Sequence, residues 1–165
     1  MNLTKIFDMQ KELDKQIAKK SQDANPDLNV EDIKVQKTLA LIIEAAEYIN
    51  EVQSFKYWKI HKDIKKSAVT EEFADLIHFL VNFSYKFEID PEIEPLILSD
   101  DINIQFQHLF IAIADIMKEI NKTNILKAFQ VALGSFVMLG YNYDDLFAAY
   151  EAKNRKNYER IANNY

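Results

Sequence analysis

The stretch TLALIIEAAEYIN, residues 38–50, combines the apolar spacing of a helix with two isolated acids. It lies in a long region whose apolar residues recur at helical spacing, and its only charged residues are Glu44 and Glu47. Three residues apart, these two carboxylates share one face of a helix. A solvated face would normally include Lys or Arg, yet none follows until Lys56. We therefore predict a helix that turns acidic side chains toward the protein interior.

The stretch EEFADLIHFLVNF, residues 71–83, repeats this arrangement. Glu72 and Asp75 are again three residues apart, and the surrounding residues are mostly apolar. Burying unpaired carboxylates costs several kcal/mol unless they become protonated or are neutralised by cations. All-oxygen ligands suit Mg²⁺, with Mn²⁺ as a substitute. The two stretches together predict a magnesium site built from Glu44, Glu47, Glu72 and Asp75.

Two alternatives compete with the magnesium site. Pairs of acids at this spacing are common on solvated helix faces, because Glu prefers the surface. A di-iron carboxylate bundle uses similar geometry but needs Glu-x-x-His pairs. His78 follows Asp75 by three residues, whereas His61 and His108 have no carboxylate three residues before them. The sequence therefore gives the di-iron alternative little support.

Outward from these two stretches, helical spacing of apolar residues continues along the chain. We expect an all-α helical bundle of five to six helices, in one domain over residues 1–165. The polar segment 21–29, with Pro26, predicts a loop. Thr70, Thr123 and Asn142 are candidate helix N-caps, and Gly140 is a candidate helix stop. The expected helices cover the segment with Leu3–Ile17, then 31 to 55 or 58, 69–87, 102–121, 124–139 and 144–162.

Composition excludes several classes of protein. Among 165 residues there are two glycines and no cysteine. Phosphate-binding loops of the Walker and Rossmann types need several glycines close together, and a thiolate metal site or cysteine nucleophile needs cysteine. The net charge of −6 disfavours binding to nucleic acid. No apolar stretch is long enough for a membrane span or a signal peptide, so we expect a cytoplasmic protein.

Two further clusters combine cations with polar or aromatic side chains. Near the C-terminus, Lys153, Asn157 and Arg160 fall on one helix face beside Asn154. Cations with amides suit phosphate and sugar oxygens, although basic residues at a helix end also complement the helix dipole. The run FKYWK, residues 55–59, combines aromatic rings and lysines that can stack on a base and contact phosphate. Its alternative is packing in the core, which we expect for Phe55 and Tyr57.

The ordered set of motifs resembles the dimeric all-α dUTPase family, within the wider MazG-like superfamily of all-α nucleoside triphosphate pyrophosphatases. Each motif alone is weak, but together they follow the family's order along nearly the whole chain. The matching residues are Gln10-x-x-Leu13-Asp14, Glu44-x-x-Glu47, Phe55 to Lys59, Glu72-x-x-Asp75-x-x-His78-Phe79, and Lys153-Asn154-x-x-Asn157-x-x-Arg160.

The resemblance implies an enzyme, a Mg²⁺-dependent dUTP diphosphatase that hydrolyses dUTP to dUMP and pyrophosphate. It also implies a homodimer whose sites draw on both subunits. The four carboxylates would hold the metal ions, and Glu44 would also be the base that orients or deprotonates water. The remaining motif residues would bind substrate: Lys56, Lys59, Lys153 and Arg160 at phosphate, Asn154 and Asn157 at the sugar-phosphate portion, Phe79 on deoxyribose beside His78, and Gln10 with Trp58 at uracil.

Two departures from the family pattern affect these expectations. Asp14 stands where the family often has Asn, and a carboxylate cannot donate a hydrogen bond to a uracil carbonyl. Asn164 replaces the usual Gly before Tyr165, so a closing tail is expected to be short or absent. A broader dCTP/dUTP or nucleoside triphosphate pyrophosphatase is therefore the alternative enzyme. A non-catalytic helical interaction module is the alternative outside enzymes.

Overall fold

The computed structural model describes residues 1–24, 27 and 29–163 and confirms the all-α fold. These residues form six helices and no strand, apart from one isolated bridge between Asn2 and Glu92. The helices are α1 (Thr4–Ala24), α2 (Val30–Val52), α3 (Lys66–Lys86), α4 (Ile102–Lys118), α5 (Lys122–Met138) and α6 (Tyr143–Ala162).

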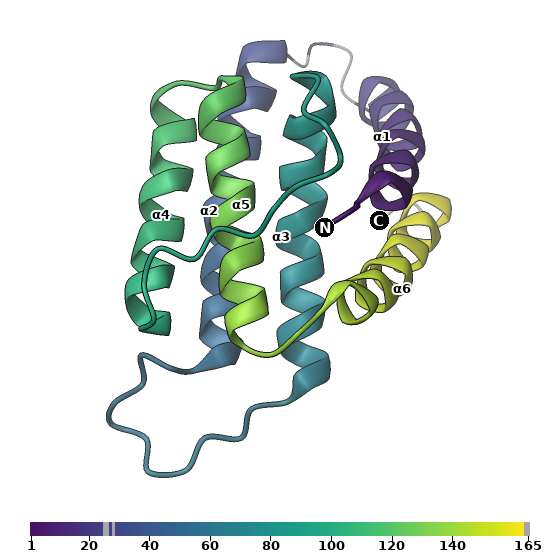
Figure 1. Ribbon diagram of the computed structural model, residues 1–165. Helices are drawn as coiled ribbons and strands as arrows, with labels where there is room; N and C mark the ends of the chain where they lie inside the picture. The colour runs from purple at the N-terminus through teal and green to yellow at the C-terminus, as the bar shows by residue number, and fades with distance from the viewer. Residues whose placement is uncertain (25–26, 28, 164–165) are drawn as a thin grey trace.

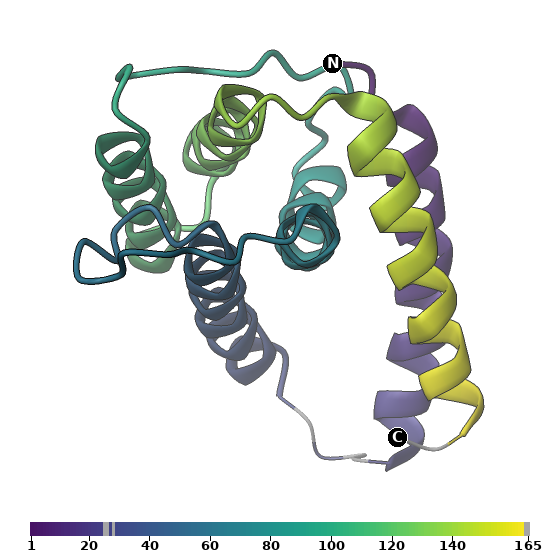
Figure 2. The ribbon, with the colours of Figure 1, turned by 90° about the horizontal axis from the view of Figure 1, so that it is seen from below.

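The helices form two groups (Figures 1 and 2). Helices α2, α3, α4 and α5 run alongside one another as a bundle, and α1 and α6 lie side by side across one flank of it. Helix α3 is the centre of the arrangement, because it packs against α1, α2, α5 and α6. Several polar residues of α3, His78 and Asn82 among them, are therefore buried against other helices.

Aromatic rings fill the core between the bundle helices. Phe73 of α3 stacks on Phe136 of α5 with ring centroids 4.1 Å apart, and it also touches Tyr48 of α2. All three rings are fully buried. Burial of such large apolar side chains is the main favourable contribution to folding, and here it fixes α2 and α3 against each other.

The ends of the helices confirm some expected caps and correct others. Asn142 caps α6 in a reciprocal capping box with Asp145, and Gly140 ends α5 with a φ of +84°. Thr123 is not a cap, since Asn121 accepts the hydrogen bond at the start of α5. Thr70 is not a cap either: α3 begins one turn earlier, and the Thr70 hydroxyl donates back to helix carbonyls.

Helix α5 also receives the long connection between α3 and α4, which crosses it in Figure 1. Leu96 of this connection donates its backbone N–H to the Gln130 carbonyl. A Cβ atom at Gly134 would lie 2.1 Å from the Leu96 carbonyl oxygen, so only glycine permits this approach. The buried Gln105 amide donates to the Leu96 and Val131 carbonyls and completes the attachment.

The first loop begins later than the sequence predicts. Helix α1 continues to Ala24 and α2 begins at Val30, while Pro26 lies outside the described residues. Over the described part of the chain, no single helix has the length and apolarity to cross a membrane, and α5 with α6 meets that test only as a pair bent by 112°.

Candidate active site

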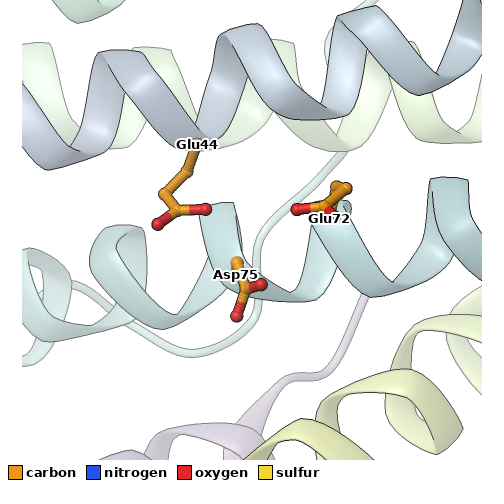
Figure 3. A group of neighbouring side chains, drawn as sticks. All are labelled: Glu44, Glu72 and Asp75. Carbon is orange, nitrogen blue, oxygen red and sulfur yellow. The ribbon is translucent and has the colours of Figure 1, made fainter.

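Three of the four predicted metal ligands meet between α2 and α3. Glu44, Glu72 and Asp75 each offer a carboxylate oxygen, and these atoms lie within 4.8 Å of one another. Figure 3 shows Glu44 reaching across from α2 toward the two acids of α3. All three side chains are half-buried. The packing of α2 on α3 thus brings together carboxylates that are 28 and 31 residues apart in the sequence.

The surroundings of this carboxylate group penalise its negative charge. Burial, followed by the charges of Asp75, Glu47 and Glu72, raises the pKa of Glu44 to about 7. Burial and neighbouring acids also raise the pKa of Glu72, and burial raises that of Asp75 although Lys153 opposes this rise. Within the described residues, Glu44 and Glu72 have no hydrogen-bond or ion-pair partner. A bound cation would remove the mutual repulsion that produces these shifts.

Glu47 lies outside the close group. Its side chain is exposed, one helical turn after Glu44, yet its charge is near enough to raise the pKa of both Glu44 and Glu72. The close group contains no histidine. A set made only of oxygen ligands fits a hard divalent cation such as Mg²⁺ or Mn²⁺ better than the Glu-x-x-His iron site.

Helix α6 supplies the predicted basic and amide residues. The Lys153 ammonium forms ion pairs with Asp75 and, at 3.4 Å, with Glu71. Asn154 is buried. Arg160 donates from Nη1 to the Asn157 Oδ1 at 3.3 Å. Lys153 therefore touches the carboxylate group directly.

A pocket of about 670 Å³ opens beside the carboxylate group. Helix α1 contributes Gln10 and Asp14, α3 contributes His78 and Phe79, and α6 contributes Asn157, with Arg160 beside it. Glu44 and Asp75 line the same pocket. The structure thus brings together predicted metal ligands and predicted substrate-binding residues from four helices.

A buried hydrogen-bond network forms one wall of the pocket. The Gln10 amide donates to Asp14 Oδ1 at 2.9 Å, and Gln10 Oε1 accepts from the Tyr150 hydroxyl. His78 Nδ1 lies 2.6 Å from the same Oε1, so Nδ1 is the protonated nitrogen. Burial, with the nearby Lys153 charge, lowers the pKa of His78 to about 3 and keeps the ring neutral.

This assignment of the His78 tautomer leaves Nε2 as an acceptor. Within the described residues, Nε2 is buried and has no hydrogen-bond partner, as is also true of the Asn154 side-chain nitrogen. Buried polar atoms are normally paired. Of these two residues, His78 lines the pocket together with Glu44 and Asp75, so its Nε2 can accept a hydrogen bond from a bound molecule.

Asp14 is satisfied by donors that sequence reasoning missed. Its Oδ2 accepts from the Asn82 amide and, at 2.6 Å, from the Tyr85 hydroxyl. Lys37 and Lys86 in turn donate to Asn82 Oδ1. The spacing of Asn82, four residues after His78 in an apolar run, was the signal that could have placed it on the same face.

The FKYWK run lies away from the pocket, in the long connection at the lower end of Figure 1. Phe55 is 42% exposed and Tyr57 is 91% exposed, so the expectation that both belong to the core is wrong. Trp58 is also exposed. Lys56 donates to the Asn50 carbonyl and Lys59 to the Gln53 side chain, and neither lines the pocket.

Comparison with known protein families gives a match over nearly the whole chain. The model of the dUTPase family matches residues 2–165. The chain belongs to the all-α dUTPase family. This family's activity is dUTP hydrolysis, and a carboxylate group of the kind described here lies inside the matched region. No curated protein matches the chain.

Proposed function

We propose that the chain hydrolyses dUTP to dUMP and pyrophosphate in a Mg²⁺-dependent reaction, with Mn²⁺ as a substitute. The observation that carries this proposal is the carboxylate group formed by Glu44, Glu72 and Asp75 at the edge of a pocket. Family membership supplies the nucleotide. The lack of a glycine-rich phosphate-binding loop in the sequence is consistent with this proposal. The triphosphate would be bound by the carboxylate-held metal and by side chains instead.

The ligand set in this proposal is Glu44, Glu72 and Asp75, joined by Glu47 from the next turn of α2. A bound divalent cation supplies charge neutralisation at phosphate oxygens and lowers the pKa of water. Glu44 is the residue that we assign as general base, accepting a proton from the attacking water. The water oxygen bonds to a phosphorus next to the α,β-bridging oxygen, the bond from that phosphorus to the bridging oxygen breaks, and dUMP and pyrophosphate leave.

The α6 and α1 residues orient the substrate in this scheme. Lys153 and Arg160 attract phosphate oxygens, and the amides of Asn154 and Asn157 reach the sugar-phosphate portion. Phe79 packs on deoxyribose beside His78, whose Nε2 accepts a hydrogen bond from the nucleoside. Gln10 lies at the base end of the pocket.

We also propose that the active form is a homodimer. Helix α2 carries exposed Val35, Leu39 and Ile43 at spacings of four, and the neighbouring α4 carries exposed Ile104 and Ile111. Contiguous exposed apolar residues are typical of an interaction surface. Pairing through this face would give Lys56, Trp58 and Lys59 a route to the partner's pocket.

The test of dimerisation is sedimentation of the wild type and of Leu39→Glu. The expected result is a dimer for the wild type and a monomer for the variant, because a charge on the apolar face opposes its burial. A wild-type monomer at micromolar concentration would contradict the proposal.

The test of the activity is pyrophosphate release from a panel of dUTP, dCTP, dTTP and UTP, with Mg²⁺ and with chelator. We expect dUTP to be preferred, and Glu47→Gln to reduce turnover. Turnover of dCTP comparable to that of dUTP would instead support the broader pyrophosphatase. That enzyme is the second candidate because Asp14 stands where the family often has Asn. If Mg²⁺ and a dUTP analogue leave the melting temperature unchanged, the interaction module is favoured.

A further inference from the structure

Lys153 lies between two carboxylates, of which only one is a member of the carboxylate group. On one side it forms an ion pair with Asp75, a member of the carboxylate group. On the other side its Nζ is 3.4 Å from Glu71 Oε1, outside that group. The Lys153 side chain is only 11% exposed. One ammonium group therefore bridges the two acids, and a small side-chain movement would leave it paired with Glu71 alone.

Glu71, which lies outside the carboxylate group, has a second cationic partner. Lys156 also pairs with Glu71, at 2.8 Å, and its hydrogen bond is the main cause that lowers the pKa of Glu71. Glu71 therefore keeps a cationic partner of its own, whereas Glu44 and Glu72 have none among the described residues. Neither the family motifs nor the proposed chemistry uses Glu71.

An ammonium on Asp75 and a divalent cation held by the same carboxylate repel each other, because both are positive and both lie next to one side chain. Without a divalent cation, Lys153 supplies part of the missing neutralisation. With one, Lys153 must release Asp75, and Glu71 is the acceptor within reach.

We propose that Lys153 is a two-position counter-ion, bridging Asp75 and Glu71 in the metal-free protein and paired with Glu71 alone once Asp75 ligates a divalent cation. This inference rests on the proposed function, because it takes the carboxylate group as the metal site. Glu71 is then a positioning residue that acts through Lys153. In the second position Lys153 is free of Asp75 and available to a substrate phosphate.

The test is a double-mutant cycle on Mn²⁺ affinity, measured by the electron paramagnetic resonance signal of free Mn²⁺ without nucleotide. Lys153→Met is expected to tighten Mn²⁺ binding by about tenfold, because no ammonium competes for Asp75. Glu71→Gln is expected to weaken binding by about threefold in the wild type and to have little effect in the Lys153→Met background. Lys66→Met is the matched control, because Lys66 joins α3 to α6 through Asp145 without touching the carboxylate group.

The cycle separates exchange from simple charge effects. If Glu71→Gln weakens binding equally in both backgrounds, the two charges act independently and the two-position proposal is wrong. It is equally wrong if Lys153→Met does not tighten binding. Thermal unfolding in chelator adds a second readout: Lys153→Met should melt lower than the wild type without metal and gain more from Mn²⁺.

Failure of the proposed function would look different. In that case Mn²⁺ would bind weakly to the wild type, or equally well to Glu72→Gln, whatever residue stands at position 153.

Discussion

Asp14 and Glu44 line the same pocket, yet their carboxylates have opposite surroundings. Asp14 accepts hydrogen bonds from Gln10, Asn82 and Tyr85. Glu44 has no such partner among the described residues, and burial with neighbouring acids raises its pKa to about 7. At the Asp14 end of the pocket, donors of the chain itself satisfy the carboxylate. At the Glu44 end, the negative charge is not neutralised.

This difference indicates how the protein divides the work of binding. A carboxylate that accepts hydrogen bonds from three fixed donors is held in place and keeps the shape of its site. Carboxylates that repel one another favour the binding of a cation instead, because the cation relieves their repulsion. We therefore expect substitutions at the Asp14 end to act on folding and shape, and those at the Glu44 end to act on metal binding and turnover.

The largest effect is expected for Glu44→Gln on turnover. Loss of the proposed base and ligand charge should lower the rate of pyrophosphate release by about 10²–10⁴-fold, with the fold retained. Glu51→Gln is the matched control two turns along α2, outside the carboxylate group. A Glu44→Gln enzyme as active as this control would remove Glu44 from the chemistry.

The next effect is expected for Asp14→Asn on stability. The amide NH₂ would face donors from Gln10, Asn82 and Tyr85, and an unsatisfied buried group costs about 1–3 kcal/mol. Urea unfolding measures the change. Asp8→Asn, an exposed position of the same helix, should stay within about 0.5 kcal/mol of the wild type. Equal stability of the two variants would mean that the network does not depend on the Asp14 charge.

A smaller loss is expected for Tyr85→Phe. This change removes one donor to Asp14 Oδ2 and keeps the ring, so it should cost about 1 kcal/mol. Tyr57→Phe, at a 91% exposed side chain, serves as the control in the same unfolding assay. If the two variants unfold alike, the Tyr85 hydroxyl contributes nothing measurable.

The smallest effect is expected in the pH dependence of metal-free stability. Because the folded-state pKa of Glu44 is raised from 4.5 to about 7, its penalty is absent below the lower value, grows as the pH rises from the lower value to the upper one, and is complete above the upper one. Glu44→Gln should thus raise the melting temperature by about 2 °C at about pH 8 in chelator, a small gain since solvent screens a half-buried charge. No gain is expected near pH 4. A gain that is the same at both pH values would contradict the charge-based account.

The sequence predicted the helices well because their apolar residues repeat at helical spacing. Their ends were less predictable, since a cap depends on a side chain meeting free N–H groups. The Asn142 side chain accepts hydrogen bonds from the free N–H groups of α6. Thr70 does not act in this way, because α3 begins four residues before it. Phe55 and Tyr57 were assigned to the core because they are aromatic, but in the structure they contact the exposed Trp58 and remain exposed themselves.

Part of the site was also predictable from spacing alone. Glu44, Glu72 and Asp75 stand out because they are acids among apolar residues, and they meet in the fold. The Asp14 network was not predictable, since Gln10 and Tyr150 are 140 residues apart and only packing of α1 on α6 brings them together. The Lys153 contact with Asp75 depends on tertiary packing in the same way.

The most direct measurement of the central claim is the anomalous scattering of Mn²⁺ in a crystal of the chain with a dUTP analogue that carries nitrogen at the α,β-bridging position. We predict Mn²⁺ within about 2–2.5 Å of carboxylate oxygens of Glu44, Glu72 and Asp75, with the α-phosphate beside it. Mn²⁺ located elsewhere, or these three side chains turned to solvent with nucleotide bound, would contradict the account.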